Sequence, residues 1–145
     1  PGGRIVVTDE LVALLRDQPD VLMGVIAHEL GHVQHRDGLD MLVRSTFISA
    51  LVGVVFGDMS GFVAAVPATL LTQAYSREAE RRADAHAAGF LHRNGVSPAI
   101  MQTLFDRLRK ASPPNDGDEA LPIAIASHPA DEERIRFFRD WAPAR

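Results

Sequence analysis

Apolar side chains recur at three- and four-residue intervals along most of the chain, which is the spacing of one face of an α-helix. The clearest such segment carries its apolar residues at Val21, Leu22, Val25, Ile26 and Leu30. With their caps and breaks, segments of this kind predict helices over residues 9–18, 19–38, 76–92 and 97–110, and a short helix after Pro129. The chain is therefore expected to be mainly α-helical.

The most apolar part of the chain is residues 38–73, with arms at 47–56 and 62–71. A helix that spans a membrane needs about 20 apolar residues, and each arm supplies about half of that. We therefore expect two packed helices of a water-soluble domain. Contact of residues 46–71 with a membrane surface or a partner protein remains the alternative.

Residues 4–7 form a β-branched run after two glycines and predict a short strand at the N-terminus. A lone strand needs a partner, either from strands upstream or from an extended peptide that joins its edge. We expect Ile5, Val6 and Val7 to be an edge that holds the backbone of a substrate. The chain begins without Met and without a signal pattern, so we expect it to be a truncated piece of a longer protein.

Length and composition narrow the function further. The 145 residues predict a single domain, residues 1–145, with a proline-containing loop over 111–127. The net charge of −4 without a long basic run argues against nucleic acid as a partner. Because the chain has no cysteine, any metal ion must be held by His, Asp or Glu.

Residues 28–32 read His-Glu-Leu-Gly-His within a strongly periodic helix. Two histidines four residues apart lie on one helical face, one turn apart, and can bind a single Zn²⁺ through neutral ring nitrogens. Glu29 then lies beside the metal, where it can take a proton from a metal-bound water. The alternative is a helix that carries two surface histidines.

A catalytic zinc ion needs a third protein ligand, and residues 76–84 are the best place to find it. Glu80 and Asp84 lie four residues apart, where two acids would repel each other on a solvated face. Facing a metal ion, one acid would bind it and the other would accept a ring N–H from a histidine ligand. The alanines at 79, 83 and 87 would let this helix approach the histidine helix closely.

At this point the chain resembles the zinc metallopeptidase family that includes HtpX, the CAAX prenyl protease and the periplasmic protease-chaperone BepA. The resemblance rests on motifs in family order at residues 1–8, 28–33, 76–84, 127–129 and 134–135. It implies a gluzincin-type, zincin-like helical domain. The segment between the motifs is too short for the full membrane hairpin of HtpX-like members, so the BepA-like branch is the closer analogy.

The resemblance also assigns roles. It implies that His28, His32 and Glu80 are the zinc ligands, that Glu29 is the general base and that Asp84 orients a ligand. It also places His128 near the metal. We expect one Zn²⁺ per chain and hydrolysis of peptide bonds in a polypeptide substrate, with misfolded or assembling envelope or membrane proteins as the targets. The expected location is the bacterial cell envelope, either periplasmic or membrane-associated.

The roles of His128 and Arg134, and the function as a whole, leave three alternatives. His128 or Arg134 would stabilise the oxyanion, or His128 would act as a fourth metal ligand that blocks the site. In the second case the chain would be a latent, chaperone-like binding module. A helical interaction domain without metal is the third reading. We expect His35 to lie at an exposed helix end, and His86 and His92 to be surface or helix-end groups.

Overall fold

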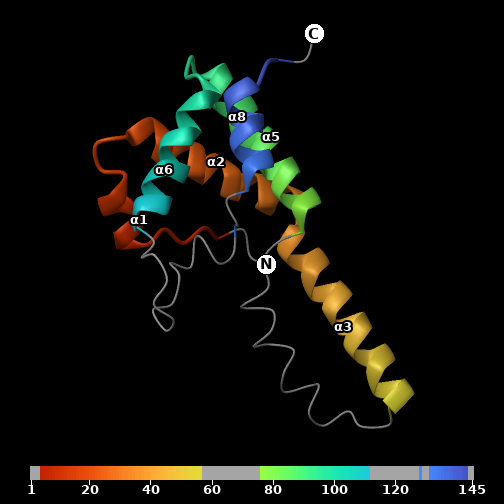
Figure 1. Ribbon diagram of the computed structural model, residues 1–145. Coiled ribbons are helices and arrows are strands. Elements are labelled where there is room, and N and C mark those ends of the chain that lie inside the picture. The colour runs from red at the N-terminus through yellow and green to blue at the C-terminus, as the bar shows by residue number, and fades with distance from the viewer. Residues whose placement is uncertain (1–3, 57–75, 112–127, 129–130, 144–145) are drawn as a thin grey trace.

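The computed structural model describes residues 4–56, 76–111, 128 and 131–143, and every regular element among them is helical. Figure 1 shows their arrangement. The elements are α1 (Asp9–Leu14), α2 (Pro19–His35), α3 (Asp37–Phe56), α5 (Arg77–Arg93), the 3₁₀ helix η1 (Pro98–Met101), α6 (Gln102–Ala111) and α8 (Glu132–Asp140). This confirms the mainly α fold.

The helices begin where the sequence offers caps. Thr8 accepts a hydrogen bond from the Leu11 backbone N–H, Ser76 does the same for Ala79, and Asp131 for Arg134. Pro19 stands in the first turn of α2, where its missing N–H costs nothing. Most helix bounds lie within one or two residues of the sequence prediction, but α1 ends at Leu14 instead of residue 18, and α2 also ends early.

That helix ends at His35 instead of continuing to residue 38. Arg36 adopts a left-handed conformation with φ of 57°, which breaks the helix and lets α3 start at Asp37 in a new direction. Arginine gives no signal for such a turn, since glycine or asparagine is usual there. In Figure 1, α3 runs away from the other helices.

Two further expectations from the sequence were a strand over residues 4–7 and a pair of packed apolar helices. The strand expected over residues 4–7 is not formed, because the described part of the chain contains no second strand with which it could share a ladder of backbone hydrogen bonds. Ile5, Val6 and Val7 still alternate between half-buried and exposed. Of the expected pair of apolar helices, α3 covers the first arm, whereas residues 57–75 lie outside the described residues, as do residues 112–127 of the expected loop.

None of the helices in the described part of the chain has both the length and the hydropathy that crossing a membrane requires.

The core forms where α2 packs against α5, its most extensive helix contact, with η1, α6 and α8 closing the sides. Its largest fully buried side chains include Leu15, Val21, Leu91, Met101 and Phe138. The side of α5 that faces α2 is lined by small residues, since Ala83, Ala87 and Ala88 are all fully buried. Small side chains allow the two helix backbones to approach each other closely.

Gly31 marks the closest approach of the two helices. A Cβ atom added there would lie 2.8 Å from the Ala83 Cα and 3.1 Å from the His86 Cβ. No flexible side chain can move aside to make room, because the nearest atom belongs to the backbone of α5. The residue therefore sets the distance between α2 and α5.

We predict that Gly31→Ala lowers the free energy of unfolding by about 1–3 kcal/mol, because α5 must move to relieve the overlap. Gly89→Ala is the matched control, since its added Cβ would meet only the flexible Arg93 side chain at 3.2 Å. That control should gain about 1 kcal/mol from helix propensity. Urea denaturation of both variants checks this, and equal stabilisation in the two would contradict the close approach.

Candidate metal centre

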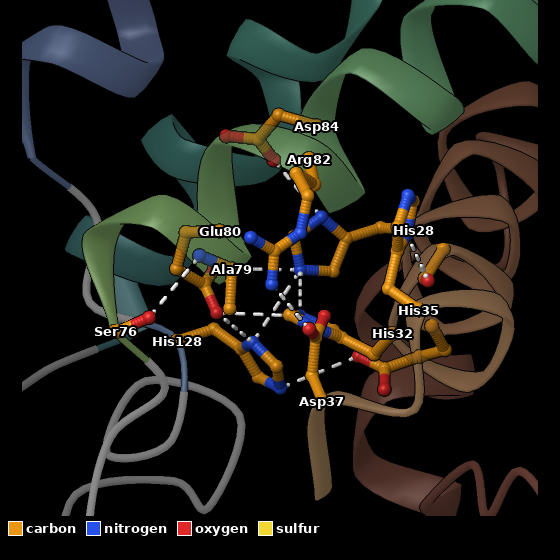
Figure 2. A network of polar contacts seen from close by, with 12 residues as sticks. His28, His32, His35, Asp37, Ser76, Ala79, Glu80, Arg82, Asp84 and His128 are labelled. Atoms are coloured by element: carbon orange, nitrogen blue, oxygen red, sulfur yellow. Dashed lines mark hydrogen bonds and ion pairs between the residues drawn. The ribbon is translucent and has the colours of Figure 1, made fainter. Parts of the chain in front are cut away.

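His28 and His32 point from α2 toward α5, one helical turn apart, and Figure 2 shows them facing each other. Both are buried, with 5% and 4% of their surface exposed. Their rings meet edge to face, and the two Nε2 atoms lie 3.1 Å apart. Histidines so deeply buried need polar partners, and these come from the neighbouring helices.

From α5, Glu80 and Asp84 reach the two histidines and are themselves buried. The Glu80 carboxylate lies 3.4 Å from His28 Nε2 and 3.3 Å from His32 Nε2. Asp84 Oδ1 lies 2.9 Å from His28 Nδ1, on the opposite edge of that ring. The structure thus brings together four of the residues that the sequence singled out, with the two acids on different sides of His28.

His128 completes the cluster from the segment before α8, as Figure 2 shows. Its Nδ1 lies 2.9 Å from Glu80 Oε1 and 3.4 Å from His28 Nε2. Its Nε2 lies 3.4 Å from Glu29 Oε1, and the Glu29 side chain is 30% exposed. One donor atom from each of His28, His32, Glu80 and His128 lies within 4.8 Å of all the others.

The ring nitrogens show what this cluster can hold. Each α2 histidine has Nδ1 at 2.9 Å from an aspartate, Asp84 for His28 and Asp37 for His32, so Nδ1 carries the hydrogen in the neutral ring. Both Nε2 atoms then direct lone pairs into the cluster, where they face each other and Glu80. Such a set of acceptors is stabilised by a cation, and nitrogen with carboxylate ligands suits Zn²⁺.

The pKa values of His28 and Glu80 also indicate a centre that attracts a cation. Burial lowers the pKa of His28, but hydrogen bonds to Asp84 and Glu80 outweigh it and raise the pKa to about 9. For Glu80, burial raises the pKa, and the contacts with His128, His28, His32 and Arg134 bring it well below its usual value. The centre therefore keeps its carboxylate ionised and attracts positive charge.

Arg134 contacts both carboxylates that α5 contributes, those of Glu80 and Asp84. Its Nε and Nη2 each lie 2.8 Å from an Asp84 oxygen, and its Nη1 lies 2.9 Å from Glu80 Oε2. The sequence suggested Arg134 as one of two candidates for stabilising an oxyanion. These contacts suit a different task, which is to hold Asp84 and Glu80 in place.

Asp37 is the residue that sequence reasoning missed. It is only 3% exposed and lies between His32 and Arg82, 2.6 Å from Arg82 Nη2. Burial raises its pKa, but Arg82 and His32 outweigh this and lower it. Only the left-handed turn at Arg36 brings this acid back to His32, so no spacing rule pointed to it.

The other histidines do not join the cluster. His35 is the exposed last residue of α2, with Nδ1 2.8 Å from the Gly31 carbonyl oxygen. His86 is half-buried on α5, with Nδ1 2.9 Å from the Ala27 carbonyl oxygen, and the exposed His92 ring lies 5.0 Å from Trp141. His35 and His92 thus lie at exposed helix ends, as expected. The expectation for His86 is wrong, because its ring lies in the middle of α5 and packs against the backbone of α2.

An apolar pocket opens beside the cluster. Its polar lining residues are His28, Glu29, His128 and Arg134, and the remainder of the lining is apolar. The apolar lining residues are Leu11, Val25, Met101, Leu104, Phe105 and Leu108. A side chain placed in this pocket would lie directly next to the polar cluster.

Comparison with known proteins identifies the family. The model of peptidase family M48 matches residues 1–142, nearly the whole chain. The chain belongs to this family. Among M48-like relatives, it is 28% identical to a protease HtpX homolog of Syntrophobacter fumaroxidans, over 93% of this chain and 61% of that protein.

Two further relatives extend the comparison. A protease HtpX homolog of Acidiphilium cryptum is 30% identical over 95% of this chain and 60% of its own length. The metalloprotease LoiP of Escherichia coli is 27% identical over 96% of this chain and 55% of its own length. The chain thus spans about three fifths of the curated relatives that it matches. No solved structure matches it significantly.

We predict that Arg134→Ala lowers the unfolding free energy of the metal-free chain by about 3–5 kcal/mol. The reason is that Asp84 and Glu80 would stay buried without the positive charge of the Arg134 guanidinium group. Arg139→Ala is the control, as Arg139 is an exposed residue of the same helix that pairs with Asp140. Its loss should stay within about 0.5 kcal/mol. Urea denaturation distinguishes the two, and similar small losses would show that Arg134 does not hold the carboxylates.

Proposed function

We propose that this chain is a single zinc metallopeptidase domain, residues 1–145, that hydrolyses peptide bonds as an endopeptidase. The observation that carries the proposal is the convergence of two histidine lone pairs and the Glu80 carboxylate, with Glu29 at the edge of the cluster. His28, His32 and Glu80 are the proposed ligands of one Zn²⁺. Asp84 orients His28 through its Nδ1–H.

When bound, zinc supplies Lewis acidity that polarises a peptide carbonyl and activates water. Glu29 is the proposed general base. It accepts the proton of the attacking water and returns it to the nitrogen of the leaving amine. Its carboxylate is partly exposed and can therefore meet water.

His128 is the better placed of the two candidates for oxyanion stabilisation. Its Nε2 lies 3.4 Å from the carboxylate of the proposed base Glu29, so an N–H at this position would lie near the proposed site of water attack. Arg134 directs its donors to Asp84 and Glu80, and its proposed contribution is to keep these carboxylates aligned.

Three features suggest how a polypeptide substrate binds. The apolar pocket beside Glu29 would take an apolar side chain of the substrate. The extended residues Ile5, Val6 and Val7 form no strand among the described residues, and Val6 is 83% exposed, which suits pairing with a peptide backbone. Apolar residues of α3 such as Phe47, 70% exposed, support the proposal that residues 46–71 contact a membrane surface or a partner.

The proposed targets are misfolded or assembling proteins of the bacterial cell envelope, where the protein would be periplasmic or membrane-associated. This part of the proposal rests on the resemblance to envelope proteases and on the HtpX-type relatives.

We predict that Glu29→Gln keeps zinc and fold but lowers cleavage of a quenched fluorescent casein by about 10²-fold or more, because only the base is lost. His32→Ala and Glu80→Ala should instead lose zinc and its stabilisation of the fold. Zinc content by atomic absorption, thermal melting and the cleavage rate are measured together. Wild-type cleavage by Glu29→Gln, or full zinc in Glu80→Ala, would refute the respective assignment.

A second function is favoured by the position of His128. Since its Nδ1 lies among the proposed ligand atoms, the ring can act as a fourth ligand that blocks the site. The protein would then be a latent, chaperone-like zinc module that cleaves only when His128 moves away.

His128→Ala separates the two roles of this residue. On the blocking role we expect faster cleavage of an unstructured substrate, because a position on the metal becomes free. On the oxyanion role we expect the rate to fall by about 10²- to 10³-fold with zinc retained. Casein cleavage and zinc content decide between them, and no change in either would exclude both.

A further inference from the structure

The acid that holds His32 comes from outside both ligand helices. Asp37 is the first residue of α3, yet it is among the most buried charged residues described, at 3% exposure. Its Oδ2 lies 2.9 Å from His32 Nδ1, and its Oδ1 lies 2.6 Å from Arg82 Nη2. Figure 2 shows Asp37 directly beside His32. A carboxylate that is buried and has a partner at each oxygen is held in a fixed position.

We propose that Asp37 is a positioning residue of the metal centre, which holds the Nδ1–H of His32 so that the Nε2 lone pair faces the metal, while Arg82 holds Asp37. The proposal rests on the ligand role proposed for His32. A ring nitrogen that binds a metal needs the other nitrogen to be fixed by an acceptor, which sets both the tautomer and the ring orientation.

The backbone geometry supports this assignment. In an uninterrupted helix, residue 37 would lie five positions beyond His32, about 140° around the helix axis from it. The left-handed Arg36, with φ of 57°, ends α2 and turns the chain back so that Asp37 meets the ring. A non-glycine residue in this conformation is strained, and such strain concentrates at functional sites.

The arrangement also repeats the one at the other histidine. His28 is held by Asp84, which is held by Arg134, and His32 is held by Asp37, which is held by Arg82. The two differ in burial, since the Arg134 side chain is 9% exposed and that of Arg82 is 37% exposed. The series His32, Asp37 and Arg82 therefore lies at the edge of the centre and connects it to the start of α3.

The test compares Asp37→Asn with Asp40→Asn in the full chain. Asp40 is the matched control, because it lies one turn along the same helix, is exposed and forms its ion pair with Arg44. Two-bond ¹H–¹⁵N NMR of the metal-free protein reports the His32 tautomer. Competition with a chromophoric chelator gives the affinity for Co²⁺, and the cobalt absorption bands report the ligand geometry.

We expect Asp37→Asn to reduce the Nδ1–H tautomer of His32, shift the cobalt bands and weaken Co²⁺ binding by about 10- to 100-fold. Asp40→Asn should match the wild type. An unchanged tautomer with Co²⁺ affinity within about twofold of the wild type would overturn the proposal.

If Asp37→Asn does not fold, Arg82→Ala decides, with Arg81→Ala as its control. Arg82→Ala should weaken Co²⁺ binding several-fold more than Arg81→Ala, because it frees the Asp37 carboxylate, and equal affinities would overturn the proposal. None of these readouts needs peptide cleavage. A wild-type protein that binds Co²⁺ but cleaves nothing would overturn the proposed function and leave the role of Asp37 intact.

Discussion

The whole centre depends on how closely α2 and α5 approach each other at Gly31. The Ala83 Cα lies only 2.8 Å from where a Cβ of residue 31 would be, and at this short separation Glu80 on one helix can reach the Nε2 atoms of both histidines on the other. A separation larger by one methyl group would break these contacts, which are only 3.3–3.4 Å long. The buried alanines of α5 thus serve the site as well as the core.

The charges buried around the histidines explain why such a cluster attracts a cation. Within the described part of the chain, three buried carboxylates, Asp37, Glu80 and Asp84, face two guanidinium groups, those of Arg82 and Arg134. With neutral histidines this leaves one negative charge in a region with little water. The hydrogen bonds to Asp84 and Glu80 raise the pKa of His28 to about 9, which favours uptake of a compensating proton by the metal-free centre. A bound cation would compensate the same negative charge, and the facing lone pairs of the two histidines would coordinate it.

How much could be predicted from the sequence follows from the kind of contact involved. His28 with His32, and Glu80 with Asp84, lie four residues apart in continuous helices, so helical periodicity alone placed each pair on one face. Asp37 could not be found this way, because its position depends on a left-handed arginine that carries no sequence signal. The role of Arg134 was equally hidden, since only packing of α8 against α5 directs its donors to Asp84 and Glu80.

His128 shows why two opposed roles suggest themselves for one residue. Its ring lies between the proposed ligand Glu80, 2.9 Å from Nδ1, and the proposed base Glu29, 3.4 Å from Nε2. A neutral imidazole has one N–H and one lone pair, so the tautomer determines what it offers to each side. With the hydrogen on Nδ1, the ring donates to Glu80 and has no lone pair for a metal there. With the hydrogen on Nε2, the ring donates toward Glu29, and Nδ1 becomes available as a ligand. A hydrogen on Nε2 is thus common to both roles, and what separates them is whether Nδ1 remains within reach of the metal when substrate enters.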